Sequence, residues 1–383
     1  MSKIKFKTSD LLPKVAQAVQ VVSQKNTISI LENVLLQHLE GNNMNITASD
    51  GETWLTVNTA VEHIDGEVNC CINAQRINTA LRSLGNDMDV EIEFNEENHI
   101  AKFKYPSGSF EFPFLDANEF PNPSTSEDDI ANVELLNKHL LDGLSLTEFA
   151  TDTDSLHPQF NGIHIDFECL PNQIVFVATD TRKLVKYTQK LDVSLETLCD
   201  KGFTLPKKAA TIILQLLTNE NDGKSCYMSF SERTFALECN GARLSTRLIS
   251  GRFPNYNAVI PTDNDKMAIV NRDALIGALK RVMAFANQKM MMATLTFENN
   301  KLLLKTQDID YSTSAQEIVE CTYDNEPITI GFPCNGLIDV VKNIRCEDVA
   351  IKMSDPQRAG IIVPSSQPVD TEYISIQMPI QVV

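Results

Sequence analysis

Two pairs of closely spaced aspartates are the side chains in this sequence whose type and spacing could perform chemistry. Asp152 and Asp154 form one pair, and Asp308 and Asp310 form the other. Carboxylates two positions apart can bind a divalent cation, and a metal bound by either pair would allow a metal-dependent phosphodiesterase. Both pairs also stand beside Thr or Tyr in polar segments, where aspartate side chains cap turns equally well. The pattern leaves a metal site and a turn as alternatives.

The other catalytic motifs that we considered are incomplete. Gly223, Lys224 and Ser225 resemble the end of a phosphate-binding loop, but Thr218 occupies the position of the required first glycine. The six histidines show no H-x-x-x-H spacing, and the sequence contains no G-x-S-x-G nucleophile motif. The nine cysteines include no C-x-x-C, so we interpret them as reduced, buried thiols. We therefore expect no catalytic residues, no metal and no cofactor.

The elements that would position these side chains occur three times along the chain. Each copy begins with a leucine-rich amphipathic helix, predicted at residues 10–22, 138–150 and 272–286. A strand that ends in aspartate follows, at Asp50, Asp180 and Asp308. A further strand then leads into a second helix, predicted at residues 74–84, 206–217 and 335–343. Units of this length are too long for a solenoid, so the repeats predict three homologous domains.

Each predicted domain is itself a duplication. In the first domain, a strand at residues 3–9 precedes helix 10–22 and three alternating strands, and the pattern then restarts at the strand before helix 74–84. Two such strand–helix–strand–strand–strand halves predict an α+β domain with two helices on one face of its sheets. Proline-containing segments at 121–126 and 261–264 are the predicted linkers. The predicted domains are residues 1–125, 126–262 and 263–383.

Charge is distributed unevenly between the predicted elements. The chain has 383 residues, is 43% hydrophobic and carries a formal net charge of −18, which argues against nucleic acid as a partner. The six predicted helices nevertheless carry a net charge of +6, so the remainder is more acidic than the whole. A basic helical surface within an acidic shell would attract DNA on one face only. Too few aromatic residues interleave with these cations for base stacking, so we expect sequence-independent contacts with phosphates.

Targeting signals are not evident in the sequence. The first ten residues are charged and contain no long apolar run, and no apolar stretch approaches the roughly 18 residues that a membrane span needs. Reduced cysteines are typical of cytoplasmic proteins, as is the lack of a targeting signal. We therefore expect a cytoplasmic, soluble protein that does not associate with membranes.

Several segments resemble one known family. They are VATDTRKLVKYT at residues 177–188, SGRFPNYNAVIP at 250–261, YISIQMPIQVV at 373–383, TISILENVLLQ at 27–37 and FNGIHIDF at 160–167. Together they resemble the bacterial sliding clamps, the beta subunits of DNA polymerase III. The combination of A-T-D-x-x-[KR]-L with G-R-F-P-x-Y and a following proline is specific. The resemblance extends over the whole chain.

The resemblance implies an architecture and a function. Three DNA-clamp domains per chain, with two helices each on the inner face, would form a head-to-tail homodimeric ring. Such a ring encircles duplex DNA without catalysing a reaction and tethers the replicative polymerase for processive synthesis. The implied partners are duplex DNA, a second copy of the chain, the polymerase alpha subunit, the clamp loader and other proteins with a clamp-binding motif. A peptide-binding scaffold without a DNA role remains a further alternative, beside the phosphodiesterase.

The resemblance also implies a groove between the second and third domains that receives short peptides of partner proteins. Its matching residues here are Phe160, Thr179, Thr181, Arg182, Leu184, Pro254, Val259, Ile376, Met378, Pro379 and Ile380. An apolar lining with an adaptable methionine suits peptide binding. The sequence departs from the family where Thr181 and Arg182 replace Gly-His and where Ala258 replaces Arg. Pro158 and Gln159 replace a tyrosine pair that is associated with DNA contact.

Two further surfaces follow from the resemblance. The positions that match the dimer interface are Arg76, Phe110, Phe112, Ala284 and Phe285. Alternation in a strand places Phe110 and Phe112 on one face, which suits either an interface or a core. The residues expected to face DNA are Lys25, Arg76, Arg82, Lys207, Lys208, Lys280, Arg281 and Lys342.

Overall fold

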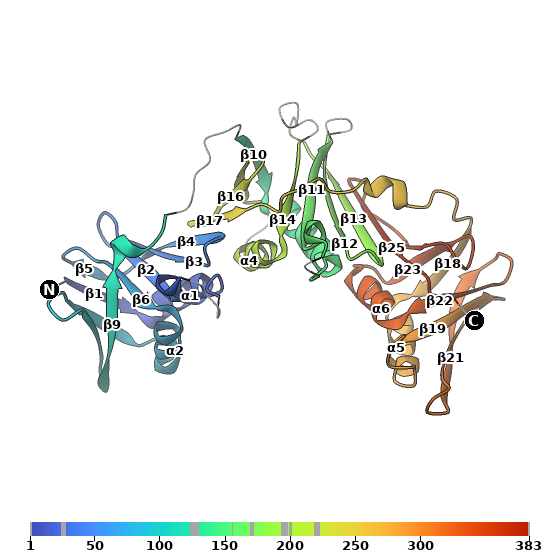
Figure 1. The fold of residues 1–383 in the computed structure, drawn as a ribbon, viewed down its shortest axis with the longest axis horizontal. Coiled ribbons are helices and arrows are strands. Elements are labelled where there is room, and N and C mark those ends of the chain that lie inside the picture. The colour runs from blue at the N-terminus through green and yellow to red at the C-terminus, as the bar shows by residue number, and fades with distance from the viewer. Residues whose placement is uncertain are drawn as a thin grey trace. The chain divides into compact units, whose positions relative to one another are not determined.

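The computed structural model describes residues 2–23, 28–122, 130–154, 156–168, 172–192, 198, 201–217 and 223–381. The chain forms two compact units. Unit 1 comprises Met1–Lys138 and Thr211–Leu248, and unit 2 comprises His139–Ala210 and Ile249–Val383. The central third of the sequence therefore contributes to both units. Each unit is organised around an extended antiparallel sheet with helices packed on it (Figure 1).

The sheet of unit 1 has 13 strands in the order β10-β15-β16-β17-β4-β3-β2-β6-β9-β8-β7-β1-β5. Their bounds are β1 (Ser2–Lys7), β2 (Asn33–His38), β3 (Asn43–Ser49), β4 (Thr53–Ala60), β5 (His63–Asp65), β6 (Asn69–Asn73), β7 (Asp89–Asn95), β8 (Ile100–Tyr105), β9 (Gly108–Asp116), β10 (Ala131–Leu136), β15 (Ser225–Phe230), β16 (Thr234–Cys239) and β17 (Ala242–Arg247).

The sheet of unit 2 has 12 strands in the order β14-β11-β12-β13-β25-β24-β23-β18-β21-β20-β19-β22. Their bounds are β11 (Gly162–Glu168), β12 (Gln173–Thr179), β13 (Lys183–Lys190), β14 (Gly202–Pro206), β18 (Lys266–Asn271), β19 (Met292–Glu298), β20 (Lys301–Asp308), β21 (Thr313–Tyr323), β22 (Ile328–Pro333), β23 (Asp348–Met353), β24 (Gly360–Pro364) and β25 (Thr371–Gln377).

All six predicted helices are present, with ends within a few residues of their predicted positions. They are α1 (Thr8–Val19), α2 (Ala74–Leu84), α3 (Asn137–Thr147), α4 (Lys207–Leu217), α5 (Arg272–Met283) and α6 (Cys334–Asn343). In unit 1, α1 packs on α2 and on the sheet; in unit 2, α5 packs in the same way on α6 and its sheet (Figure 1). Both pairs bury an apolar stripe, which in α5 includes Leu275, Leu279 and Val282.

The repeated aspartates cap equivalent turns. The Oδ1 atom of Asp50 accepts hydrogen bonds from the backbone N–H groups two and three residues later, at 3.0 and 2.8 Å. Asp180 does the same at 3.0 and 2.8 Å, and Asp308 at 2.9 and 3.3 Å. A carboxylate that accepts these bonds stabilises a tight turn between two strands. The three turns identify β4, β13 and β21 as the same strand of the repeat.

The strand that follows each of these turns pairs with the last strand of a domain in two of the three copies. In unit 1, β4 pairs with β17 in antiparallel register, with Thr53 opposite Thr246. In unit 2, β13 pairs with β25, with Lys183 opposite Gln377. We call these contacts the first and second junctions. The remaining strands of the two kinds are β21 and β9.

Among the described residues, β21 and β9 each keep one open edge. Strand β21 pairs with β20 over residues 313–320, and it meets β18 only at residues 321–323. Strand β9 pairs with β8 over residues 108–113, and it meets β6 only at residues 114–116. An open edge presents unpaired backbone N–H and C=O groups that can bind another strand. One chain thus contains two formed junctions and one open edge of each kind.

Candidate functional site

The outer face of the second junction carries an apolar cluster. Leu184 and Ile376 are directly opposite each other across β13 and β25, and both are buried. Phe253 and Tyr256 cover them in the same cluster, and Phe160 packs against it. Both aromatic residues come from residues 250–261, a segment between β17 and β18 that begins before the linker predicted at 261–264 and is called the linker from here on. The structure therefore brings together three of the predicted groove residues, Phe160, Leu184 and Ile376, although the first and last of them lie more than 200 residues apart in the sequence.

The rim of this cluster is apolar and exposed. Val259 is 56% exposed and Met378 is 45% exposed, and Pro254 is also on the surface. Val259 ends a short 3₁₀ turn, Tyr256–Val259, and Pro254 follows the buried Phe253 directly. Exposed apolar side chains held around a buried cluster are a common feature of protein-binding sites.

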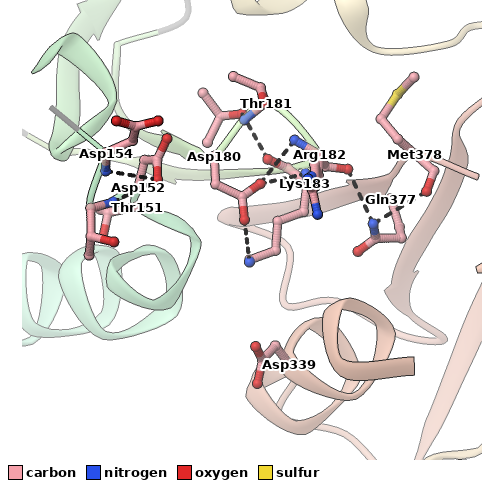
Figure 2. Close-up of polar contacts among 12 residues, drawn as sticks. Thr151, Asp152, Asp154, Asp180, Thr181, Arg182, Lys183, Asp339, Gln377 and Met378 are labelled. Atoms are coloured by element: carbon pink, nitrogen blue, oxygen red, sulfur yellow. Dashed lines mark hydrogen bonds and ion pairs between the residues drawn. The ribbon is translucent and has the colours of Figure 1, made fainter. Parts of the chain in front are cut away.

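The turn after β12 and the C-terminal segment are bonded to each other (Figure 2). The backbone N–H of Met378 donates to the carbonyl oxygen of Arg182 at 2.8 Å. The Nε2 atom of Gln377 donates to the same carbonyl at 3.2 Å. Further along, the N–H of Ile380 donates to the carbonyl of Gly331 at 2.8 Å. These bonds hold residues 377–380, including the predicted groove residue Pro379, in place beside Arg182.

Thr181 has a strained backbone at the edge of the groove. Its φ is +72°, a left-handed conformation that β-branched residues rarely adopt. Its N–H donates to Thr179 Oγ1 at 3.1 Å, and that hydroxyl donates to the carbonyl of Lys183 at 2.7 Å. The departure from glycine seen in the sequence therefore occurs where the turn requires glycine-like geometry.

The helix-facing side of the second junction contains a cleft of about 270 Å³. Lys183 and Gln377 line it from the sheet, and Met290, Asn335 and Gly336 line it from the neighbouring loop and α6. A Cβ atom on Gly336 would lie 2.7 Å from Gln377 Oε1, so the Gln377 side chain approaches the helix backbone closely here. Arg182 lines the cleft and also belongs to the predicted groove.

Apart from Arg182, the residues of this cleft are absent from the predicted groove. The signal that could have found Lys183 and Gln377 is strand alternation, since each directly neighbours a predicted groove residue and points to the opposite face. The Nζ atom of Lys183 contacts Asp180 Oδ2 at 2.6 Å, which fixes its direction within the turn (Figure 2).

Two of the three predicted interface residues of unit 1, Phe110 and Phe112, lie on its open-edged strand β9. The rings of Phe110 and Phe112 are 5.2 Å apart on one face of β9, and both are half-buried. Both contact the buried Phe103, with centroid separations of 4.9 and 5.3 Å. The two rings thus extend the core to the edge of the sheet. Arg76, on α2, is exposed.

The predicted interface residues of unit 2 follow α5, which ends at Met283 and not at residue 286 as predicted. Ala284 and Phe285 lie beyond the helix and are exposed, Phe285 by 48%. The carbonyl of Phe285 accepts a hydrogen bond from Thr313 Oγ1 at 3.4 Å. Phe285 is thereby tied to the start of β21, beside its open edge.

The residues predicted to face DNA have different environments. Arg82 and Lys280 are exposed, as is Arg76, whereas Lys207 and Lys208 are half-buried. Lys342 contacts Asp339 at 2.6 Å. Lys25 lies outside the described residues. The cations on these helices are therefore not equally available to a phosphate.

Arg281 is committed to a carboxylate. Its Nε and Nη2 atoms bind the two oxygens of Glu317 at 2.8 and 3.0 Å. These hydrogen bonds raise the pKa of Arg281 and lower the pKa of Glu317. Glu317 is on β21, so Arg281 is directed toward the open edge of the sheet. A DNA phosphate would therefore compete with Glu317 for the guanidinium group of Arg281.

The two aspartate pairs cap turns. The Oδ1 atom of Asp152 accepts from the N–H groups of Thr153 and Asp154 at 2.7 and 3.1 Å, and Asp308 caps its turn as described above (Figure 2 shows Asp152 and Asp154). In the described part of the chain, no three His, Cys, Asp or Glu side chains are grouped as a metal site. The turn alternative accounts for these carboxylates.

The described cysteines have the character of core residues. Burial raises the pKa of Cys71 and of Cys226 to about 12, so neither is a thiolate at neutral pH. None of the seven cysteines that the structure describes forms a disulfide.

Three family models match consecutive parts of the chain. They are the N-terminal, central and C-terminal domains of the DNA polymerase III beta subunit, matching residues 2–124, 134–255 and 257–380. A beta sliding clamp of Caulobacter vibrioides (strain NA1000 / CB15N) is 26% identical over 99% of this chain and 100% of its own. One of Treponema pallidum (strain Nichols) is 28% identical over 99% of both.

Solved structures have the same fold. A sliding clamp from Bartonella birtlesii bound to griselimycin has a TM-score of 0.92 and 24% identity, with all of both chains covered. A sliding clamp from Caulobacter crescentus has a TM-score of 0.87 and 25% identity, again with all of both chains covered. The predicted α+β fold of repeated clamp domains is confirmed.

These matches define a sliding clamp, a non-catalytic processivity factor. The chain belongs to the DNA polymerase III beta subunit family. The phosphodiesterase alternative receives no support from the fold, from the matched relatives or from the aspartate turns. Within the described residues, no helix is both long and apolar enough to cross a membrane.

Proposed function

We propose that two copies of this chain join head to tail, encircle duplex DNA and tether the replicative polymerase. The observation that carries this proposal is the unused pair of edges. Each junction joins the strand after an aspartate turn to the last strand of a domain, and β21 and β9 are the remaining strands of these two kinds. Two exchanged β21–β9 contacts would use both edges of both copies and leave none open.

The first junction supplies a register for this contact. There Leu244 is opposite Leu55. Two alignments transfer this register to the open edges. Superposing the aspartate turns makes Ala315 on β21 equivalent to Leu55 on β4. Superposing the tight turns that precede β9 and β17 makes Phe110 equivalent to Leu244. We therefore expect Phe110 of one protomer opposite Ala315 of its partner. Alanine there leaves room for the phenyl ring beside Phe285.

Exposed apolar side chains surround the edge of β21. Ile309 and Tyr311 are 80% and 76% exposed in the turn before it, and Phe285 is exposed beside its start. Exposed apolar groups that lie next to an unpaired strand favour burial by a partner. We expect all three to be covered in the dimer.

Sparse cations on the helices suit a clamp that slides. Arg76, Arg82, Lys280 and the two half-buried lysines of α4 can attract phosphates without reading bases. A few weak contacts of this kind favour DNA within the ring, and they do not hold the clamp at any one DNA sequence. The net charge of −18 disfavours DNA elsewhere on the surface.

The groove at the second junction is the proposed site for short peptides of the polymerase alpha subunit, the clamp loader and other clamp-binding proteins. The apolar rim of Pro254, Val259 and Met378, the last of which donates its N–H to Arg182, supports this assignment. The related clamp from Bartonella birtlesii is described as bound to griselimycin. The proposal includes a cytoplasmic location and domains at residues 1–125, 126–262 and 263–383.

Light scattering on the purified protein tests whether two copies join into a dimer. We expect a dimer, and we expect Phe285→Asp to give monomers because it places a charge in the apolar contact. Leu156→Asp, at a residue that is 77% exposed, is the matched control and should remain dimeric. A wild-type protein that stays monomeric at micromolar concentration would contradict ring formation.

Topological binding is tested on DNA. After loading onto nicked circular DNA, the clamp should resist a high-salt wash and should leave once the circle is linearised. Equal retention on circular and linear DNA would mean that contacts, and not encirclement, hold the protein.

A further inference from the structure

The linker that forms one wall of the groove is attached to the sheet through two aromatic residues. Phe253 and Tyr256 are buried, whereas Pro254 and Val259 beside them are exposed at the groove. Pro254 follows Phe253 directly in the chain, and Val259 ends the 3₁₀ turn that begins at Tyr256. Whatever positions Phe253 therefore also positions the wall.

His164, on β11, supports Phe253. The two rings are stacked, with centroids 4.6 Å apart and planes within 4°. The same Phe253 ring meets Phe160 edge-on, with a centroid separation of 5.9 Å and an angle of 84°. Phe160 is one of the groove residues. A continuous series of aromatic contacts thus connects the imidazole to the groove, while His164 itself is not part of the lining.

Polar groups fix the imidazole and the second anchor. His164 Nδ1 lies 3.2 Å from Thr204 Oγ1 on β14. The hydroxyl of Tyr256 donates to Asp166 Oδ2 at 3.2 Å. A Cβ atom on Gly202 would lie 3.1 Å from Asp166 Oδ1 and 3.3 Å from the imidazole, so glycine leaves the space that this arrangement needs.

Few charges face this site. Asp166 is the acidic neighbour of His164 on the same strand, and Glu168 acts on Tyr256 from further along it. Lys186, on β13, places its ammonium group 5.8 Å from the Tyr256 ring and 3.4 Å from Asn257 Oδ1. From β14 the imidazole meets only the neutral Thr204 among the described contacts.

Protonation of His164 opposes this packing. Burial lowers the pKa of His164 below its ordinary value of 6.5, and the charge of Asp166 opposes this only in part. We call the linker closed when Phe253 stacks on His164 and released when that contact is broken. The closed conformation therefore binds fewer protons than the released one. The closed conformation is fully favoured above pH 6.5 and loses this advantage as the pH falls below it.

We propose that His164 is a positioning residue of the partner groove, which holds the linker closed while neutral and weakens peptide binding when it is protonated. This inference rests on the proposed peptide-binding function of the groove. His164 acts through Phe253 and does not touch the peptide. The residue is absent from the predicted groove because nothing in its strand context marks it as more than an outward-facing side chain.

Calorimetric titration of the intact dimer tests the proposal. The probe is a peptide with blocked ends that contains only Gln, Leu, Ser and Phe, so that it carries no titratable group. We expect its affinity for the wild type to fall about fivefold between pH 7.5 and 5.5. His164→Phe keeps an aromatic ring without a titrating group, so it should bind within about twofold of the wild type at pH 7.5 and show no fall in acid.

The control variant is His157→Leu, because His157 is exposed and its ring is only 5.8 Å from Phe160. It should keep the wild-type pH dependence. His164→Ala should weaken binding about tenfold at pH 7.5 and should speed hydrogen exchange of the linker amides at residues 250–260, while the dimer persists. His164→Phe should restore both.

Three results would overturn the proposal: a wild-type pH dependence in His164→Phe, its loss in His157→Leu, or unchanged binding by His164→Ala. Failure of the groove itself has a different signature. In that case the wild type would show no binding at pH 7.5, or binding that removal of residues 378–383 leaves unchanged.

Discussion

The two formed junctions have the same backbone pairing and different outer faces. At the first junction, Trp54 is opposite Ser245, and the indole N–H donates to the carbonyl of Pro121 at 3.4 Å. At the second, Leu184 is opposite Ile376 beneath the linker, and exposed apolar residues form the rim. The backbone pairing that builds the sheet is thus the same in both copies of the repeat. The outward side chains have diverged, and only the second junction has acquired the features of a peptide site.

The aspartate turns at the two junctions also differ, in the residue that follows the aspartate. Gly51 adopts a φ of +92° at the first junction, and Thr181 adopts +72° at the equivalent position of the second. Glycine takes up this conformation without cost, whereas threonine is strained by about 1–3 kcal/mol. The strained residue therefore stands at the junction that carries the proposed function.

The largest expected effect comes from removing the rim that distinguishes the second junction. Deletion of residues 378–383 should weaken binding of a polymerase-derived peptide about 100-fold, because it removes an apolar anchor from the groove. Fluorescence anisotropy measures the affinity and light scattering the dimer, which should persist. Truncation after Ile380 is the matched control and should bind normally. Unchanged affinity after the longer deletion would remove the assigned groove.

A change at the centre of the second junction should affect stability. Ile376→Ser introduces the residue found at the equivalent position of the first junction, and it should cost about 2–4 kcal/mol of unfolding free energy because a buried side chain is lost. Scanning calorimetry measures the change. At the first junction, Ser245→Ala should stay within about 0.5 kcal/mol. Similar costs at the two sites would mean that both outer faces bury comparable apolar contacts.

Exchanging the turn residues tests whether strain separates the junctions. Thr181→Gly should stabilise the protein by about 1 kcal/mol, offset in part by the greater freedom of glycine in the unfolded chain. Gly51→Thr should destabilise it by a similar amount, through conformation alone, since its Cβ would lie 3.6 Å from the nearest atom. Chemical denaturation measures both. Destabilisation by Thr181→Gly would show that Thr181 makes contacts worth more than its strain.

The smallest effect is expected on a charged face outside both junctions. Hydrogen bonds from Lys104 and Lys3 lower the pKa of Glu93 to about 2. Its stabilising contribution is therefore present above pH 4.5 and is lost as the pH falls toward 2. Glu93→Gln should lower the melting temperature by about 1–3 °C at pH 7, and the difference should vanish near pH 2. An equal difference at both pH values would assign the effect to packing.

Much of the fold follows from local sequence patterns. The six helices were predicted because apolar residues at helical spacing, such as Leu275 and Leu279, must face a sheet. The aspartates that end strands were visible as a repeat, and their turn-capping role follows from short-range chemistry. The end of α5 was predicted too late because Ala284 and Phe285 continue the apolar pattern, although their role is at an edge.

The site was less predictable because it depends on contacts between distant segments. Arg281 was expected to face phosphates, but its partner Glu317 is 36 residues away on another element. The stack of His164 on Phe253 requires the linker to cross the sheet, which no local pattern in the sequence indicates. The groove residues themselves were found through their resemblance to a family. Their placement as groove, interface and DNA-facing groups stays a prediction.

The open edges of β9 and β21 have a consequence for how many copies assemble. They are different surfaces, so in the proposed assembly one copy's β9 would accept another copy's β21 and leave a fresh edge at each end. Such an assembly closes only if the rotation at each junction divides a full turn evenly. A small change of angle at the formed junctions, far from either edge, would then give fibres or larger circles in place of a dimer. Stoichiometry is thus encoded in the packing inside each chain as much as in the surface at which two chains meet.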